Sequence, residues 1–156
     1  MANLPQTLLV PVDGSPNASS AAAHAAAMAE RLGARLCLLH AFPRTLRELT
    51  WLPPARYVDQ EYMKYLSPEA FQNLREQTAA AAFTAAREAI GETRAPVEEK
   101  MLGGSAGEAI LEHAASTADP MIVIGRRGLS HVTEVLMGST TQHVIHHANC
   151  PVLVIR

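Results

Sequence analysis

The run Met121-Ile122-Val123-Ile124-Gly125 joins four apolar residues directly to a glycine. Four more largely apolar runs lie along the chain, at residues 7–12, 35–41, 97–102 and 151–155. Nearly continuous apolar runs are typical of strands covered on both faces, and such strands form parallel sheets. The run at 97–102 contains three charged residues, as edge strands often do. We therefore expect a five-stranded parallel sheet.

Helical segments separate these runs. We expect helices at residues 17–32, 68–90, 106–116 and 139–147. Ser15 or Asn17 can cap the first helix and Gly33 can end it, while Ser67 and Gly91 bound the second. Strands that alternate with helices form βαβ units with right-handed crossovers. The sequence thus predicts an α/β fold, a single doubly wound domain over residues 1–156 with helices on both faces of the sheet.

Composition excludes several classes of protein. The 156 residues suit one ordinary domain, and the 48% hydrophobic content excludes a disordered chain. A formal net charge of -2 leaves no basic surplus for nucleic-acid binding. No window approaches the roughly 20 apolar residues of a membrane span, and the first residues do not resemble a secretory signal. Cys37 and Cys150 form no CxxC pair, so we expect reduced thiols and a cytoplasmic protein.

A glycine pattern follows the run at 121–124. Gly125, Gly128 and Gly138-Ser139 have the spacing G-x2-G-x9-G-S. Gly125 ends a strand at the edge where open α/β sheets bind ligands, and a glycine there can adopt positive φ and bring main-chain N–H groups close to an anion. The helix that Gly138 and Ser139 open offers unpaired amides and a positive dipole end, and Ser139 and Thr140 add hydroxyl donors. The pattern predicts a polyphosphate site without a lysine.

A second pattern suggests a serine hydrolase. Residues 103–107 match the G-x-S-x-G nucleophile elbow, and Asp119 and His131 follow in the chain order of a hydrolase triad. Ser105 and Asp119 belong to opposite edges of the sheet, roughly 17 Å apart across a five-residue strand, so we do not expect a triad. We expect Ser105 to be a helix N-cap in a capping box with Glu108.

The sequence gives little support for a metal site or a P-loop. His143 and His147 are four residues apart on one helix face, but no third metal ligand is evident nearby. The chain also lacks the G-x-x-x-x-G-K-[ST] sequence of P-loop NTPases.

The chain resembles the universal stress proteins, in particular their ATP-binding branch. The resemblance rests on Val10-Pro11-Val12-Asp13-Gly14-Ser15, on the glycine pattern, and on residues 118–125 and 147–154. It implies the strand order 3-2-1-4-5. It does not cover residues 43–66, a long excursion with Trp51 and all three tyrosines, which is either a surface cover or a lid or subunit contact.

The resemblance implies an ATP site. Pro11 and Asp13 would flank the nucleoside, with Asp13 near the ribose or a phosphate-bound Mg²⁺ or Mn²⁺, and Ala41 would lie against the adenine. The other implied site residues are Val12, Ile124, Gly125, Arg126, Arg127, Gly128, Leu129, Gly138, Ser139, Thr140 and Thr141. Arg126 replaces a residue that is often small and hydroxylated in the family, and it would add a phosphate contact.

The resemblance also implies a homodimer formed by antiparallel pairing of the last strand, Val152 to Ile155. We expect an ATP-binding sensor or switch in the stress response that acts through an unknown protein partner. No side chain stands out as a catalytic base, so at most slow hydrolysis is expected. Two alternatives stay open: an interaction module of the same fold that binds no nucleotide, and a slow ATPase or phosphotransferase.

Overall fold

The structure, a computed structural model, describes residues 3–50, 67–129 and 137–156. Most of the excursion at 43–66, and His131, lie outside the described residues. The elements, in chain order, are β1 (Thr7–Pro11), α1 (Pro16–Leu32), β2 (Arg35–Phe42), α2 (Leu46–Thr50), α4 (Pro68–Ile90), β3 (Val97–Gly103), α5 (Ala106–Ala115), β4 (Pro120–Gly125), α6 (Ser139–His147) and β5 (Val152–Ile155).

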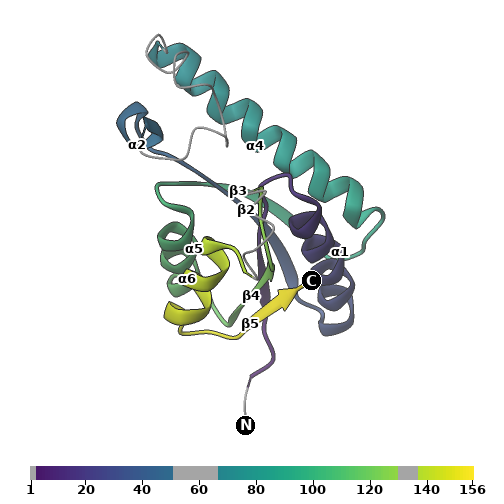
Figure 1. The fold of residues 1–156 in the computed structure, drawn as a ribbon. Helices are drawn as coiled ribbons and strands as arrows, with labels where there is room; N and C mark the ends of the chain where they lie inside the picture. The colour runs from purple at the N-terminus through teal and green to yellow at the C-terminus, as the bar shows by residue number, and fades with distance from the viewer. Residues whose placement is uncertain (1–2, 51–66, 130–136) are drawn as a thin grey trace.

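The five strands form one parallel sheet in the order β3-β2-β1-β4-β5 (Figure 1). Thr7 of β1 is opposite Arg35 of β2 on one side and Pro120 of β4 on the other. The predicted α/β sheet is therefore confirmed, together with the strand order that the family resemblance implied. The charged run at 97–102 is an edge strand, as expected.

Helices cover both faces of the sheet: α1 and α4 lie on one face, and α5 and α6 on the other (Figure 1). The buried residues of α1 are all alanines, which lets its backbone approach β1 and β4 closely. Leu8 and Val10 of β1 belong to this first core, whereas Leu9 belongs to the second, with Ile110 of α5 and Val144 of α6. This alternation follows from the two-residue period of a strand.

The helix ends follow the sequence signals with one exception. Ser15 caps α1 by accepting a hydrogen bond from the Ala18 N–H at 3.2 Å, and Gly33 ends the helix with a φ of 66°. Ser67 caps α4 in the same way. Ser105 is at the N-cap of α5, but its side chain makes no capping hydrogen bond, so the expected capping box is wrong. The Ser105 hydroxyl is left for other partners.

A short helix that the sequence reasoning missed, α2, follows β2. The Thr45 hydroxyl accepts a hydrogen bond from the Glu48 N–H at 3.2 Å, and the Glu48 carboxylate accepts one from the Arg44 N–H at 2.7 Å. Thr45-Leu46-Arg47-Glu48 is thus a T-x-x-E start signal, which could have revealed the helix. Leu49 packs against Phe42 and anchors α2 beside the end of β2.

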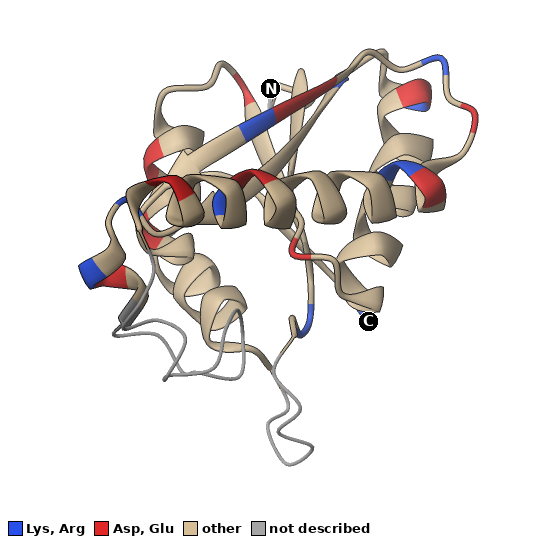
Figure 2. Ribbon diagram, turned by 90° about the horizontal axis from the view of Figure 1, so that it is seen from above, with Lys and Arg blue, Asp and Glu red and all other residues tan. Residues whose placement is uncertain are grey.

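Charged residues of both signs occur along β3 (Figure 2). Arg87 of α4 pairs with Glu99 at 2.7 Å, and Arg35 of β2 pairs with Glu98 at 3.9 Å. Charges of this kind on an edge strand discourage pairing with another chain. Among the described residues, no helix is both long enough and apolar enough to cross a membrane.

Candidate functional site

The carboxyl ends of β1, β2 and β4 border a small crevice. Because β2 and β4 flank β1, the connections that leave these strands diverge, which is where open α/β sheets form binding sites. A cavity of about 80 Å³, which we call the switch-point cavity, lies here. It is lined by Pro11, Val12, Asp13, Ala18, Leu39, His40, Ala41, Ala106, Ile110, Ile124, Gly125, Arg127, Gly128, Gly138, Ser139, Thr140 and Thr141. Of the predicted site residues, Arg126 and Leu129 do not line it.

Five lining residues were not anticipated from the sequence: Ala18, Leu39, His40, Ala106 and Ile110. Ala106 and Ile110 come from α5 and add an apolar wall, but no motif distinguishes them from ordinary core positions. His40 does carry a signal, since it is a lone histidine inside an apolar strand. The side chain of the predicted Val12 is buried in the first core, its N–H donates to the Leu39 carbonyl at 2.8 Å, and its carbonyl accepts a hydrogen bond from His40.

Asp13 joins three segments around the cavity. One carboxylate oxygen accepts a hydrogen bond from the Ser15 N–H at 2.9 Å, and the other accepts one from the Leu129 N–H at 3.2 Å. A Cβ atom on Gly128 would collide with this carboxylate, so a glycine is needed for the close approach. Each carboxylate oxygen keeps lone-pair capacity for a further donor.

The two glycine bends lie against each other. The Gly138 N–H donates to the Arg126 carbonyl at 2.9 Å, and a Cβ on Gly138 would lie 3.5 Å from the Arg127 Cα. The bend after β4 and the start of α6 therefore form one wall of the cavity.

Gly125 does not have the positive φ that a glycine can adopt at this edge of the sheet. The glycines with positive φ are Gly14, Gly33, Gly91 and Gly104, and Gly138 has a φ of -68°. Gly125 is instead required by proximity, because a Cβ there would lie 2.8 Å from the main-chain carbonyl of Asn17. The pattern brings α1 and β4 together rather than reversing the chain.

Several donors expected to bind phosphate are used within the protein. The Arg126 N–H donates to the Ile155 carbonyl at 2.7 Å, and the Thr141 hydroxyl donates to the Gly125 carbonyl at 2.8 Å. Thr141 is only 3% exposed. Together with the N–H groups of Leu129 and Gly138, these donors hold the site in shape.

The donors that remain are at the start of α6. The amides of Ser139, Thr140 and Thr141 precede the first intrahelical hydrogen bond, which the Gln142 N–H makes to the Gly138 carbonyl at 2.9 Å. The helix has no side-chain cap and no acidic residue in its first turn. The exposed Ser139 and half-buried Thr140 add hydroxyls. These groups form a compact anion-binding surface.

The two arginines after β4 are placed differently. Arg127 lines the switch-point cavity, whereas Arg126 does not. The main chain of Arg126 is held between β5 and the start of α6 through its bonds to Ile155 and Gly138. Arg127 is therefore the one of these two arginines that borders the cavity.

His40 is 2% exposed and braces the end of β1. Its Nδ1–H donates to the Val12 carbonyl at 2.8 Å, while Nε2 is buried without a hydrogen-bond partner among the described residues. Burial lowers the pKa of the imidazole below its ordinary value of 6.5, against opposing effects of the Val12 carbonyl and the Asp13 charge. His40 is therefore neutral at pH 7 and positions the residue that precedes Asp13.

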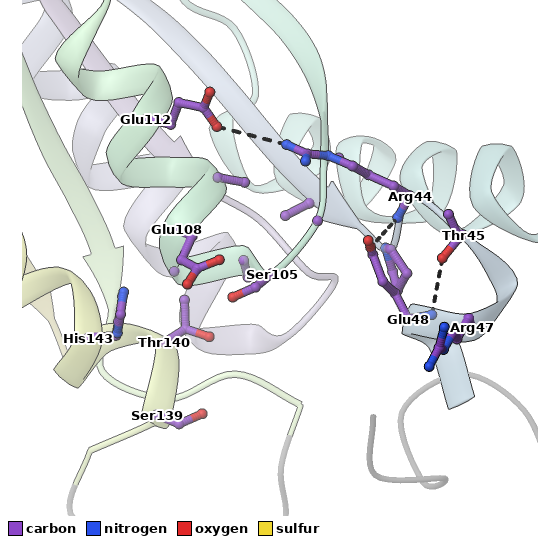
Figure 3. Close-up of a pocket in the computed structure, with 17 residues that line it drawn as sticks. Arg44, Thr45, Arg47, Glu48, Ser105, Glu108, Glu112, Ser139, Thr140 and His143 are labelled. Atoms are coloured by element: carbon purple, nitrogen blue, oxygen red, sulfur yellow. Dashed lines mark hydrogen bonds and ion pairs between the residues drawn. The ribbon is translucent and has the colours of Figure 1, made fainter. Parts of the chain in front are cut away.

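A larger cavity of about 950 Å³, which we call the outer cavity, adjoins the first. Figure 3 shows side chains of α5 and α6 on one side of it, and Arg44, Thr45 and Glu48 on the other. The two cavities share Ala41, Ala106, Ser139 and Thr140 as lining residues. They are thus parts of one continuous depression.

The hydrolase alternative is not supported by the geometry. The Asp119 carbonyl accepts hydrogen bonds from the N–H groups of Gln6 and Thr7 at 3.0 and 3.5 Å, at the amino end of β1. Ser105 is at the opposite edge, after β3. An Asp119–Ser105 triad is therefore excluded.

The histidines of α6 do not form a metal site with other described side chains. His143 and His147 stack with ring centroids 4.4 Å apart, and the His147 Nδ1–H donates to the His143 carbonyl at 2.8 Å. Among the described residues, no three His, Cys, Asp or Glu side chains are grouped to hold a metal ion.

The comparisons with known proteins agree on one family. The family model described as "Universal stress protein family" matches residues 5–156. A universal stress protein of Thermus aquaticus is 34% identical over 152 residues, which are 97% of this chain and 98% of that protein. The solved UspA of Lactobacillus plantarum is 29% identical with a TM-score of 0.75, covering 99% of this chain and all of the other. A universal stress protein from Archaeoglobus fulgidus, solved with dAMP, shares the fold at 23% identity and a TM-score of 0.61, with full coverage of both chains.

Proposed function

The chain belongs to the universal stress protein family, and we propose that its switch-point cavity binds an adenine nucleotide, with ATP as the physiological form. In this proposal the bound nucleotide makes the protein a sensor or switch in the stress response. The observation that carries the proposal is the open start of α6, which presents unpaired amides and two hydroxyls to a cavity with an apolar wall.

The phosphates are assigned to the start of α6. The N-termini of α1 and α4 are each closed by a serine hydroxyl, whereas the α6 N-terminus has no side-chain cap. Phosphate oxygens would accept hydrogen bonds from the Ser139 and Thr140 amides and gain from the helix dipole. The Arg127 guanidinium supplies a further donor at the same wall.

The nucleoside is assigned to the opposite wall. Ala41, Ala106 and Ile110 offer an apolar surface to the base, and the Asp13 carboxylate keeps acceptor capacity for a ribose hydroxyl. The switch-point cavity alone is smaller than the 300–1,000 Å³ typical of small-molecule sites, so the nucleotide would extend over its rim into the outer cavity.

Related structures support this ligand class. Besides the dAMP complex, one solved neighbour is a universal stress protein with cAMP and another is an Arabidopsis family member with AMP. Their common part is adenine on a pentose that carries phosphate at its 5′ oxygen. The triphosphate of ATP would engage the α6 N-terminus more fully than these monophosphates.

Hydrolysis would be slow at most. Among the described residues that line the switch-point cavity, the ionisable candidates for a base are Asp13, whose oxygens already accept two N–H groups, and His40, whose Nε2 is buried. In this proposal the remaining acceptor capacity of Asp13 is used by the ribose, so neither side chain orients a water molecule at the phosphates. A single carboxylate engaged in this way is also a poor metal site, so a Mg²⁺ or Mn²⁺ ion would be held mainly by the nucleotide phosphates.

A switch needs a route from the ligand to the surface. The Asp13–Leu129 hydrogen bond supplies one. A ribose hydroxyl that approaches Asp13 would alter this hydrogen bond and, with it, the link between the end of β1 and the loop after β4. We expect a protein partner to read this change. The exposed edge of β5 would pair with a second copy to form a homodimer.

The test is direct binding. We expect the purified protein to release adenine nucleotide on denaturation, and calorimetry to show ATP binding much more tightly than GTP. No binding of any adenine nucleotide would favour the alternative of an interaction module. Appreciable turnover of bound ATP would favour the slow ATPase instead.

A further inference from the structure

The outer cavity is larger than a mononucleotide needs. Its volume of about 950 Å³ lies near the upper end of the range for small-molecule sites, and it adds to the switch-point cavity rather than replacing it. The residues shared by the two cavities include Ser139 and Thr140, where the phosphates are assigned. A group esterified to the distal phosphate would therefore enter the outer cavity.

The walls of the outer cavity carry free polar groups. Ser105 makes no capping hydrogen bond, and Glu108 has no hydrogen bond or ion pair with another described side chain. Figure 3 shows Glu108 and Ser105 from α5 on the same side of the cavity as Thr140 and Ser139 from α6. The carboxylate can accept hydrogen bonds from the hydroxyls of a sugar, and the neighbouring protein hydroxyls can donate hydrogen bonds to them.

A basic side chain frames the opposite side. Arg44 extends toward Glu112, with 3.9 Å between Nη2 and the carboxylate (Figure 3). Its stem lies over Gly103, where a Cβ would be 2.8 Å from the Arg44 Cγ. The absence of a side chain at Gly103 therefore lets Arg44 lie along the rim.

The charge of the cavity wall favours an uncharged group over a charged one on the distal phosphate. Three carboxylates, those of Glu48, Glu108 and Glu112, line the outer cavity against two guanidinium groups, those of Arg44 and Arg47. A charged group beyond the phosphates held at the start of α6 would meet this net negative wall. An uncharged hydroxylated group would instead give Glu108 the donors that it lacks.

We propose that the outer cavity is a sugar subsite, so that the protein binds, besides ATP, an adenosine diphosphate whose distal phosphate carries a neutral sugar. This inference rests on the proposed nucleotide site, and it adds a ligand class and a set of residues, Ser105, Glu108 and Arg44, to it. The α6 N-terminus binds the diphosphate, and the sugar hydroxyls donate to Glu108.

The experiment compares ADP with ADP-ribose by calorimetry on the full chain, in one buffer at one ionic strength. We expect ADP-ribose to bind at least about tenfold more tightly than ADP, the effect of one hydrogen bond to a charged group. Glu108→Gln removes the charge without changing the shape and should abolish most of that advantage. Glu88→Gln, an equivalent change on the exposed face of α4, is the matched control and should keep it.

Each outcome has a distinct meaning. Equal affinity for ADP and ADP-ribose would overturn the sugar subsite and leave the nucleotide site standing. Equal losses of the advantage in Glu108→Gln and Glu88→Gln would show a general charge effect and would also overturn the subsite. Failure of both ligands to bind would remove the nucleotide site itself, and the subsite with it.

Discussion

The carboxylate of Asp13 accepts a hydrogen bond from the main-chain N–H of Leu129 at 3.2 Å, across 116 positions of the chain. The same carboxylate accepts from the Ser15 N–H at 2.9 Å. One side chain thus fixes the end of β1, the start of α1 and the loop after β4 relative to one another. The shape of the switch-point cavity depends on this contact.

Asp13→Asn tests that contact. The amide replaces one acceptor oxygen with an NH₂ donor that must face an N–H group, so the free energy of unfolding should fall by about 1–2 kcal/mol. ATP affinity should fall as well, because the loop is released. Urea unfolding and calorimetry measure the two effects. Asp119→Asn, at the opposite edge of the sheet, is the control, and equal effects of both variants would contradict the assignment.

Ser139→Glu separates binding from folding. A carboxylate in the first turn of α6 stabilises the helix dipole by about 0.3–1 kcal/mol but repels phosphate at the same place. We expect an unchanged or slightly higher unfolding midpoint and a loss of ATP binding of at least about tenfold. Gln142→Glu adds the same charge to an exposed position of α6. Undiminished ATP binding in Ser139→Glu would remove the phosphates from this helix end.

The burial of His40 predicts a pH dependence of stability. Since the pKa of folded His40 is below 6.5, the unfolded chain binds more protons at acid pH. The free energy of unfolding should therefore fall as the pH drops below about 6.5, toward the lower pKa of the folded state. His40→Gln removes this titration and leaves the other histidines in place. The stability advantage of the native chain should shrink between pH 7 and 5, and a constant difference would refute this role.

Two glycine substitutions should differ in cost. A Cβ on Gly125 meets the Asn17 main chain at 2.8 Å, whereas a Cβ on Gly107 meets the His143 side chain. The backbone of α1 cannot move aside as an imidazole can, so Gly125→Ala should destabilise by about 1–3 kcal/mol. Gly107→Ala should be close to neutral, because alanine also favours the helix by about 1 kcal/mol. Thermal and urea unfolding of both variants test the order.

The proposed dimer can be disrupted without disturbing the sheet. The carbonyls of Pro151 and Ile155 accept hydrogen bonds from the N–H groups of Ile122 in β4 and of Arg126 just after it. Successive residues of a strand turn their main-chain groups to opposite sides, so those of Val154 face the free edge. Val154→Pro removes an N–H from that edge alone, which edge strands tolerate. Light scattering should show a dimer for the native chain and a monomer for the variant. Leu153→Pro, whose N–H faces β4, should instead destabilise the fold.

The sequence alone predicted the features that depend on local patterns. Apolar runs gave the five strands because burial on both faces requires apolar residues at successive positions. Ser15, Gly33 and Ser67 marked helix ends because caps are satisfied within a few residues. The T-x-x-E signal at Thr45 is equally local, so α2 could also have been predicted.

Other features were decided by the tertiary structure. The sequence named Thr141, Leu129 and Gly138 as donors in a phosphate site, but Gly125, Asp13 and Arg126 already accept their hydrogen bonds. It also left positive φ open to Gly125, where the lack of a side chain instead allows close packing against α1. Hydrogen-bond partners and close approaches between distant segments depend on how helices and strands pack. No local sequence pattern encodes the distance between such segments. A single sequence therefore determines which groups are present at the edge of the sheet, whereas packing determines which of them remain free for a ligand.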